Sequence, residues 1–128
     1  MVLTDQPPLK GHRPSADVLF RSIAREFGRE AVAVLMTGMG DDGADGMGDV
    51  FRAGGLTLAQ SLDTCIVESM PRSAIDRGWV TRVVPLSMLA LQLQAHCLRP
   101  PHHRPFRWWP SDWFGKMDLG IFIEGEMK

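Results

Sequence analysis

The alternation of apolar and polar positions along the chain predicts helices separated by short strands. Apolar residues recur about every four positions over residues 15–27, which indicates an amphipathic helix. The apolar residues 31–36 then run without a break into a glycine-rich loop, as is typical of a strand buried on both faces of a parallel sheet. We therefore predict a strand over residues 31–37, followed by a helix over about 43–53 that ends at two glycines.

The same alternation continues in shorter units beyond these glycines. Helices and strands in this order favour an α/β fold with a mostly parallel sheet and covering helices. Three or four strands are fewer than the roughly five or more of a doubly wound domain, so we expect part of the sheet to be missing. The predicted segments are a strand at 56–60, a polar loop at 61–64, an extended piece at 65–67, a helix from Pro71 to Gly78, a strand at 79–84 and a helix at 87–96, capped by Ser87.

The composition is typical of a single globular domain and indicates neither a nucleic-acid-binding nor a membrane-spanning protein. The 128 residues make one domain at most, and 45% hydrophobic with 23% charged residues is ordinary for a globular protein. A formal net charge of −1 gives no electrostatic footprint for nucleic acid. No apolar run is long enough to span a bilayer, and the first residues lack a secretory signal pattern, so we expect no membrane insertion and a cytoplasmic location.

Residues 99–128 differ from the rest in composition. This tail of unknown role carries many prolines and three of the four tryptophans, Trp108, Trp109 and Trp113. His102 and His103 are adjacent and cannot share a helical face, so they do not predict a metal site. A non-catalytic module that binds a partner protein through this tail and the glycine-rich loop is one alternative for function.

The glycine-rich loop after the first strand also matches a phosphate-binding pattern. Three glycines satisfy G-x-G-x-x-G between a strand and a helix, and Asp63 lies 20 residues further on. A dinucleotide-binding half-domain is therefore a second alternative. Against it, Asp41 and Asp42 stand where a pyrophosphate would sit, and each such like-charge contact costs roughly 1 kcal/mol in water and more when buried. The glycines are Gly38, Gly40 and Gly43.

Calcium binding is excluded by the spacing of the acidic residues. Asp41, Asp45 and Gly46 match positions one, five and six of an EF-hand loop. Position three is Gly43, however, and position twelve is Arg52, where a bidentate glutamate is required. We expect no metal and no other cofactor.

Two interpretations of the loop carboxylates remain open from the residues alone. Asp41 and Asp42 could cap the helix that follows them, which is worth about 0.5–2 kcal/mol. Alternatively, one carboxylate at a strand end could orient a histidine that activates a nucleophile. The flanking glycines would then allow a tight turn, and their N–H groups could face a developing oxyanion.

Four segments of the chain resemble the catalytic domain of CheB, the chemotaxis receptor protein-glutamate methylesterase. The four segments are residues 12–22, 35–47, 52–55 and 64–75. The second of them contains the specific TGMG-x-DG element. The likeness covers about residues 2–98. It implies the C-terminal part of a doubly wound, Rossmann-like hydrolase domain whose Ser-His-Asp triad removes methyl esters from glutamates on chemoreceptors, with deamidation of certain glutamines as a second activity.

The resemblance also implies roles for individual residues. Asp42 falls on the triad acid and the Met39 backbone amide on the oxyanion-hole donor, with Gly38, Gly40 and Gly43 supporting the loop. The implied partners are methylated chemoreceptor proteins, and no cofactor is implied.

The chain departs from the family pattern upstream of its first matching segment. In the family, the triad serine and histidine lie upstream of that segment, and a receiver domain precedes the esterase. No histidine here takes the place of the base: His12 precedes a helix and His96 ends one. We expect residues 1–98 to be the C-terminal portion of the methylesterase domain, inactive alone. The serines, none of which lies in a G-x-S-x-G elbow, are Ser15, Ser22, Ser61, Ser69, Ser73, Ser87 and Ser111.

Overall fold

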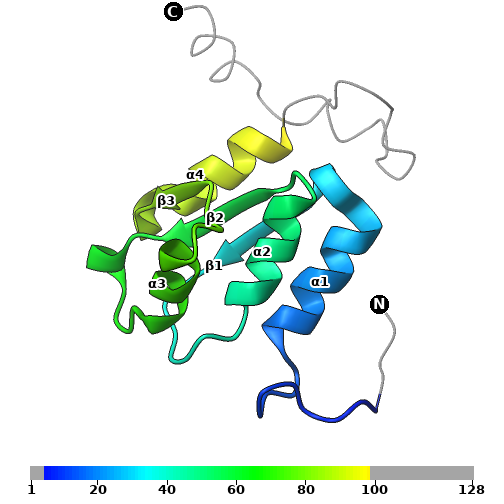
Figure 1. The fold of residues 1–128 in the computed structure, drawn as a ribbon. Coiled ribbons are helices and arrows are strands. Elements are labelled where there is room, and N and C mark those ends of the chain that lie inside the picture. Colours follow the sequence, from blue (N-terminus) through cyan, green and yellow to red (C-terminus); the bar gives the residue numbers. More distant parts are fainter. Residues whose placement is uncertain (1–4, 99–128) are drawn as a thin grey trace, which may run out of the picture. The chain divides into compact units, whose positions relative to one another are not determined.

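The structure is a computed structural model that describes residues 5–98, so the predicted tail with Trp108, Trp109, Trp113, His102 and His103 lies outside the described residues. Helices and strands alternate along the described chain (Figure 1), with short 3-10 turns at Gly28–Glu30 and Leu62–Thr64. The elements are α1 (Ala16–Phe27), β1 (Val32–Leu35), α2 (Ala44–Arg52), β2 (Leu56–Gln60), α3 (Ser69–Asp76), β3 (Arg82–Val84) and α4 (Leu86–Cys97).

The three strands form one open sheet in the order β1-β2-β3, and both pairs are parallel. Val32 lies opposite Leu56 in the first pair, and Leu58 lies opposite Arg82 in the second. A parallel pair needs a crossover connection, and α2 and α3 provide the two crossovers. The predicted α/β class with a parallel sheet and covering helices is confirmed.

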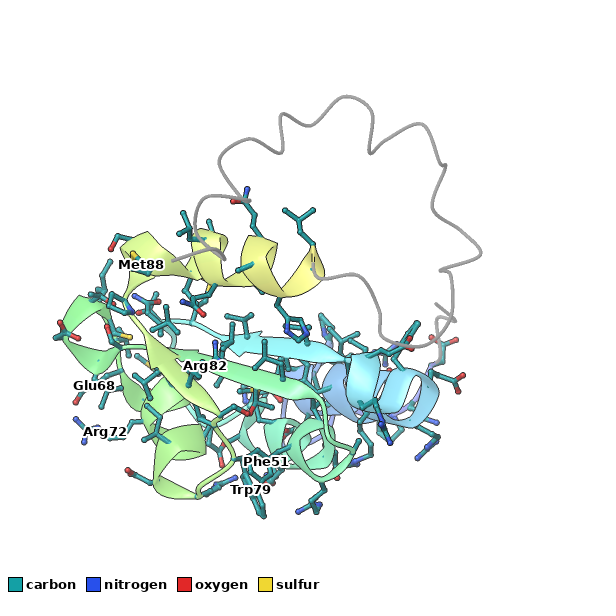
Figure 2. All side chains as sticks on the ribbon, turned by 90° about the horizontal axis from the view of Figure 1, so that it is seen from above. Phe51, Glu68, Arg72, Trp79, Arg82 and Met88 are labelled. Carbon is teal, nitrogen blue, oxygen red and sulfur yellow. The ribbon has the colours of Figure 1, made fainter. Side chains whose placement is uncertain are left out.

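Apolar side chains pack against both faces of the sheet. On one face α2 and α3 cover the strands, and α1 packs on α2; α4 lies on the opposite face (Figures 1 and 2). The alternation of side chains along β1 explains the division, because Ala33 and Leu35 face one core while Val34 faces the other. The larger core comprises Ala24, Ala31, Ala33, Leu35, Ala44, Met47, Val50 and Ala74, and the smaller one Leu58, Val84 and Leu89.

Helix α1 approaches α2 closely because α2 carries a glycine at the contact. A Cβ atom on Gly46 would lie 2.8 Å from the Cβ of Phe20 and 2.9 Å from the Cα of Asp17. The Gly46 N–H donates to Asp17 Oδ1 at 2.7 Å, and the Asp17 side chain is 1% exposed. This contact joins the first turns of the two helices and fixes the start of α1 beside the carboxyl end of β1.

Two predicted extended segments differ from the observed structure. Of the predicted strand 79–84, Arg82–Val84 forms β3, and the Thr81 N–H still donates to the Thr57 carbonyl of β2 at 2.9 Å. The strand does not extend to Trp79, whose ring packs against Phe51 on α2, with ring centroids 5.9 Å apart (Figure 2). Residues 65–67 are not a strand and form bends whose backbone bonds to the loop after β1. Helix α4 begins at Leu86, so Ser87 lies within its first turn.

Within residues 5–98, no helix is both long enough and apolar enough to cross a bilayer. The same residues contain no group of three or more histidine, cysteine or acidic side chains placed to hold a metal ion.

Candidate active site

The glycine-rich loop leaves β1 at the carboxyl edge of the sheet, where open α/β proteins place their ligand and catalytic groups. Two glycines make the turn possible, since Gly40 has φ +93° and Gly43 has φ +95°, values that L side chains adopt only with strain. Gly43 is the N-cap of α2. The backbone therefore reverses within a few residues, and Asp42 lies between the two left-handed glycines.

Asp42 caps α1, the helix that precedes it in the chain. Its Oδ2 accepts the Ala16 N–H at 2.7 Å, and its Oδ1 accepts the Ser15 hydroxyl at 2.8 Å and the Asp17 N–H at 3.2 Å. The interpretation that Asp42 caps the helix following it is therefore wrong. Ser15 takes the predicted N-cap position, but its hydroxyl bonds Asp42 and makes no cap to its own helix.

The surroundings of Asp42 favour its ionised form. Partial burial alone raises the pKa of the carboxyl, but the hydrogen bonds from Ala16, Ser15 and Asp17, with the charge of His12, outweigh it and leave the pKa below its usual value. A carboxylate offers about four acceptor positions, and three are occupied. One acceptor position is left for a further donor such as an imidazole N–H.

His12 does not use that position. Its charge helps to lower the pKa of Asp42, but no hydrogen bond among those of residues 5–98 joins the two side chains. His12 is exposed, and its backbone N–H donates to Leu9.

The Met39 amide is one of several loop amides with no hydrogen bond within the described residues, and the amides of Asp41, Asp42 and Gly43 are the others. Of the consecutive amides from Thr37 to Gly40, Met39 alone donates no hydrogen bond within the described residues. The interpretation that the N–H groups of the flanking glycines face a developing oxyanion is therefore wrong for Gly38 and Gly40, whose amides are already bonded. The acceptors are Gln60 Oε1 for Thr37 at 2.9 Å, the Val67 carbonyl for Gly38 at 2.9 Å and Ser69 Oγ for Gly40 at 3.0 Å.

Sequence reasoning missed the residues that hold this loop in place. Gln60 ends β2, is 1% exposed, and connects Thr37 to the Thr64 carbonyl through its two amide atoms. A polar residue that closes an otherwise buried strand is the signal that could have indicated it. Ser69 carried no comparable signal, because its role depends on a contact with residues about 30 positions away.

The geometry at the start of α2 disfavours the dinucleotide interpretation. The buried Asp17 carboxylate already accepts the Gly46 N–H, one of the first amides of that helix. Asp45 in the same turn bonds Lys10 and Arg77, and its pKa is lowered by the hydrogen bond from Lys10 despite some burial. Carboxylates therefore occupy the place that a pyrophosphate would take.

These features define an α/β protein with an open parallel sheet, whose carboxyl edge carries a hydrogen-bonded carboxylate and an amide with no partner among the described residues. The model of the family described as CheB methylesterase matches residues 1–93. The structure also resembles the crystal structure of the CheB methylesterase catalytic domain of Thermotoga maritima, with a TM-score of 0.69 and 32% sequence identity. The match covers 71% of this chain and 48% of that chain.

Relatives agree with the family match. A protein of Koribacter versatilis named protein-glutamate methylesterase/protein-glutamine glutaminase 2 is 60% identical over 89 residues, which are 70% of this chain and 24% of that protein. A protein-glutamate methylesterase/protein-glutamine glutaminase of Salmonella typhimurium is 52% identical over 91 residues, 71% of this chain and 26% of that protein. The chain belongs to the CheB methylesterase family. It spans about a quarter of the length of these curated relatives.

The lowered pKa of Asp42 predicts that the protein loses stability in acid. Because the folded-state pKa lies below the unfolded value of about 3.9, the stabilisation is fully present above that value and is lost as the pH falls through the folded pKa. The Asp42→Asn variant cannot bind this proton and should show a shallower acid dependence. Urea unfolding followed by far-UV circular dichroism at about pH 6 and about pH 3 measures both proteins, and equal acid losses would contradict the prediction.

Proposed function

We propose that residues 5–98 supply the acid and the oxyanion donor of a methylesterase that hydrolyses methyl esters of protein glutamates. The observation that carries the proposal is the pairing, in one turn, of a carboxylate with an open acceptor position and an amide that makes no hydrogen bond within the described residues. Membership of the CheB methylesterase family supports the same assignment. Methylated chemoreceptors are the proposed substrates, and adaptation in chemotaxis is the proposed role.

The proposed chemistry divides the catalytic groups between two parts of a domain. Asp42 would accept a hydrogen bond from the far nitrogen of a histidine, so that the near nitrogen takes the proton of a serine as it attacks the ester carbonyl. The carbonyl oxygen gains negative charge in the tetrahedral intermediate, and the Met39 N–H would donate to it. The intermediate then breaks its bond to the methoxy group, which leaves as methanol with the proton held by the histidine, and water hydrolyses the remaining acyl-enzyme ester to the glutamate carboxylate and free serine. The serine and histidine come from outside residues 5–98.

The test joins this segment to the rest of a catalytic domain. In the grafted domain, residues 5–98 of this chain replace the matching segment of the Thermotoga maritima catalytic domain. We expect the grafted domain to release methanol from a methylated chemoreceptor, whereas the 128-residue chain alone releases none above background, because binding and an oxyanion donor without nucleophile and base provide only modest catalysis.

The unaltered Thermotoga domain serves as the positive control, and circular dichroism checks that the grafted domain is folded. A folded grafted domain without esterase activity would refute the proposed function. Turnover by the 128-residue chain alone that Asp42→Ala abolishes would refute the division of catalytic groups.

A further inference from the structure

The loop after β1 is fastened to the segment that begins α3. The Thr37 hydroxyl donates to the Val67 carbonyl at 2.9 Å and accepts the Val67 N–H at 2.9 Å. The Gly38 N–H donates to the same carbonyl at 2.9 Å. A Cβ on Gly38 would lie 2.3 Å from Met70 Sδ, so the Met70 side chain packs directly against the loop backbone at Gly38. The loop therefore takes its position from α3 as well as from β1.

Ser69 bonds to the residues on both sides of Met39. Its hydroxyl donates to the Gly38 carbonyl at 3.0 Å and accepts the Gly40 N–H at 3.0 Å. The Met70 N–H is a second donor to the Gly38 carbonyl, at 3.2 Å. Two donors from the first turn of α3 thus converge on one carbonyl oxygen of the loop.

That carbonyl belongs to the peptide unit that carries the Met39 N–H. Because a trans peptide is planar, its C=O and N–H point in opposite directions, and fixing the Gly38 oxygen towards α3 directs the Met39 N–H away from α3. A hydrogen bond accepted by the carbonyl also polarises the peptide and strengthens its N–H as a donor. The same contact therefore sets both the direction and the donor strength of this amide.

We propose that the Ser69 hydroxyl is a positioning residue that orients and polarises the Met39 amide as an oxyanion donor. The proposal rests on the proposed function and adds to it a side chain that acts through the backbone of the loop. The nearby charged side chains of Glu68 and Arg72 form an ion pair with each other at 2.6 Å (Figure 2). Ser69 is thus the polar side chain at the start of α3 that bonds to the loop.

The kinetic test compares Ser69 variants of the grafted domain. In Ser69→Ala the Gly38 carbonyl loses one of its two donors and the Gly40 N–H loses its acceptor, so we expect kcat to fall roughly tenfold with KM changed less than about twofold. Ser69→Thr keeps the hydroxyl and should restore kcat to within about threefold. Ser73→Ala is the matched control on the same helix, because the Ser73 side chain makes no hydrogen bond within the described residues.

The spectroscopic test uses the 128-residue chain itself, labelled with 15N. In Ser69→Ala we expect the Gly40 amide to exchange with solvent roughly tenfold faster and the Met39 amide resonance to shift, while the amides of β1 and β2 keep their exchange rates. Ser69→Thr should return both signals towards the wild-type values, and Ser73→Ala should leave them unchanged.

The two tests separate the failure of this inference from the failure of the proposed function. An active grafted domain whose kcat is unchanged in Ser69→Ala, or is not restored by Ser69→Thr, overturns the role of Ser69 alone. An inactive but folded grafted domain overturns the proposed function and the inference with it. Unchanged Met39 and Gly40 signals in Ser69→Ala overturn the inference whatever the kinetics show.

Discussion

Replacing Asp42 by asparagine in the grafted domain is expected to lower kcat for methyl ester hydrolysis roughly 1,000- to 10,000-fold. Asparagine keeps the size of the side chain but presents an NH2 group in place of one carboxylate oxygen. The carboxylate both accepts the N–H of a histidine and stabilises the imidazolium that forms when the serine is deprotonated, and the neutral asparagine cannot do both. The measurement is the rate of methanol release at saturating substrate for wild type and variant.

Asp41→Asn is the matched control for this prediction. Asp41 is the neighbouring acid in the same turn, and its carboxylate pairs with Arg77 at 3.3 Å and, among the described residues, makes no hydrogen bond to the start of α1. Such exposed pairs contribute little, so kcat should stay within about threefold of wild type. Equal losses in the two variants would indicate a general effect of charge in the loop and would contradict the assignment of Asp42 as the triad acid.

Part of the Asp42→Asn effect is structural and has to be measured separately. The carboxylate accepts three hydrogen bonds from the first turn of α1, and the asparagine NH2 would face at least one of these donors. Loss of such a bond costs about 1–3 kcal/mol of stability. Circular dichroism at the assay temperature must therefore show a folded variant, and the kcat comparison applies under that condition.

Gly46→Ala is expected to destabilise the chain by about 2–4 kcal/mol. The added methyl group would meet the backbone of α1, 2.9 Å from the Cα of Asp17 and 3.0 Å from its carbonyl oxygen. Overpacking of this kind costs about 1–3 kcal/mol, and moving the helices apart also weakens the buried bond from the Gly46 N–H to Asp17. The gain in helix propensity, about 1 kcal/mol, offsets only part of this.

Gly48→Ala provides the comparison on the same helix. It brings the same gain in propensity, but its methyl group would meet the side-chain ring of Trp79 at 3.0 Å, and a ring can shift where a backbone cannot. We expect a change within about 1 kcal/mol of wild type for this variant. Urea unfolding followed by far-UV circular dichroism measures both, and a Gly46→Ala variant as stable as Gly48→Ala would contradict the close helix contact.

The elements of the fold were largely predictable because local patterns determine them. The predicted strand at 56–60 coincides with β2, and the predicted helix at 15–27 is observed as Ala16–Phe27. The strand predicted at 79–84 is shortened at its start, where Trp79 packs on α2, a contact with residues almost 30 positions earlier. Prediction failed where a distant partner competes with the local preference.

The candidate site, too, was predictable where local patterns determine it and unpredictable where distant segments meet. The sequence alone marked the acidic glycine-rich loop, placed it at the carboxyl end of a buried strand, and, through its resemblance to the methylesterase family, singled out Asp42 and Met39. It could not specify which helix Asp42 caps or which loop amides are already bonded. Those features depend on backbone groups of α1 and on Gln60, Val67 and Ser69. Periodicity and turn chemistry act between near neighbours in the chain, whereas hydrogen bonds between distant segments exist only once the sheet and its helices have packed.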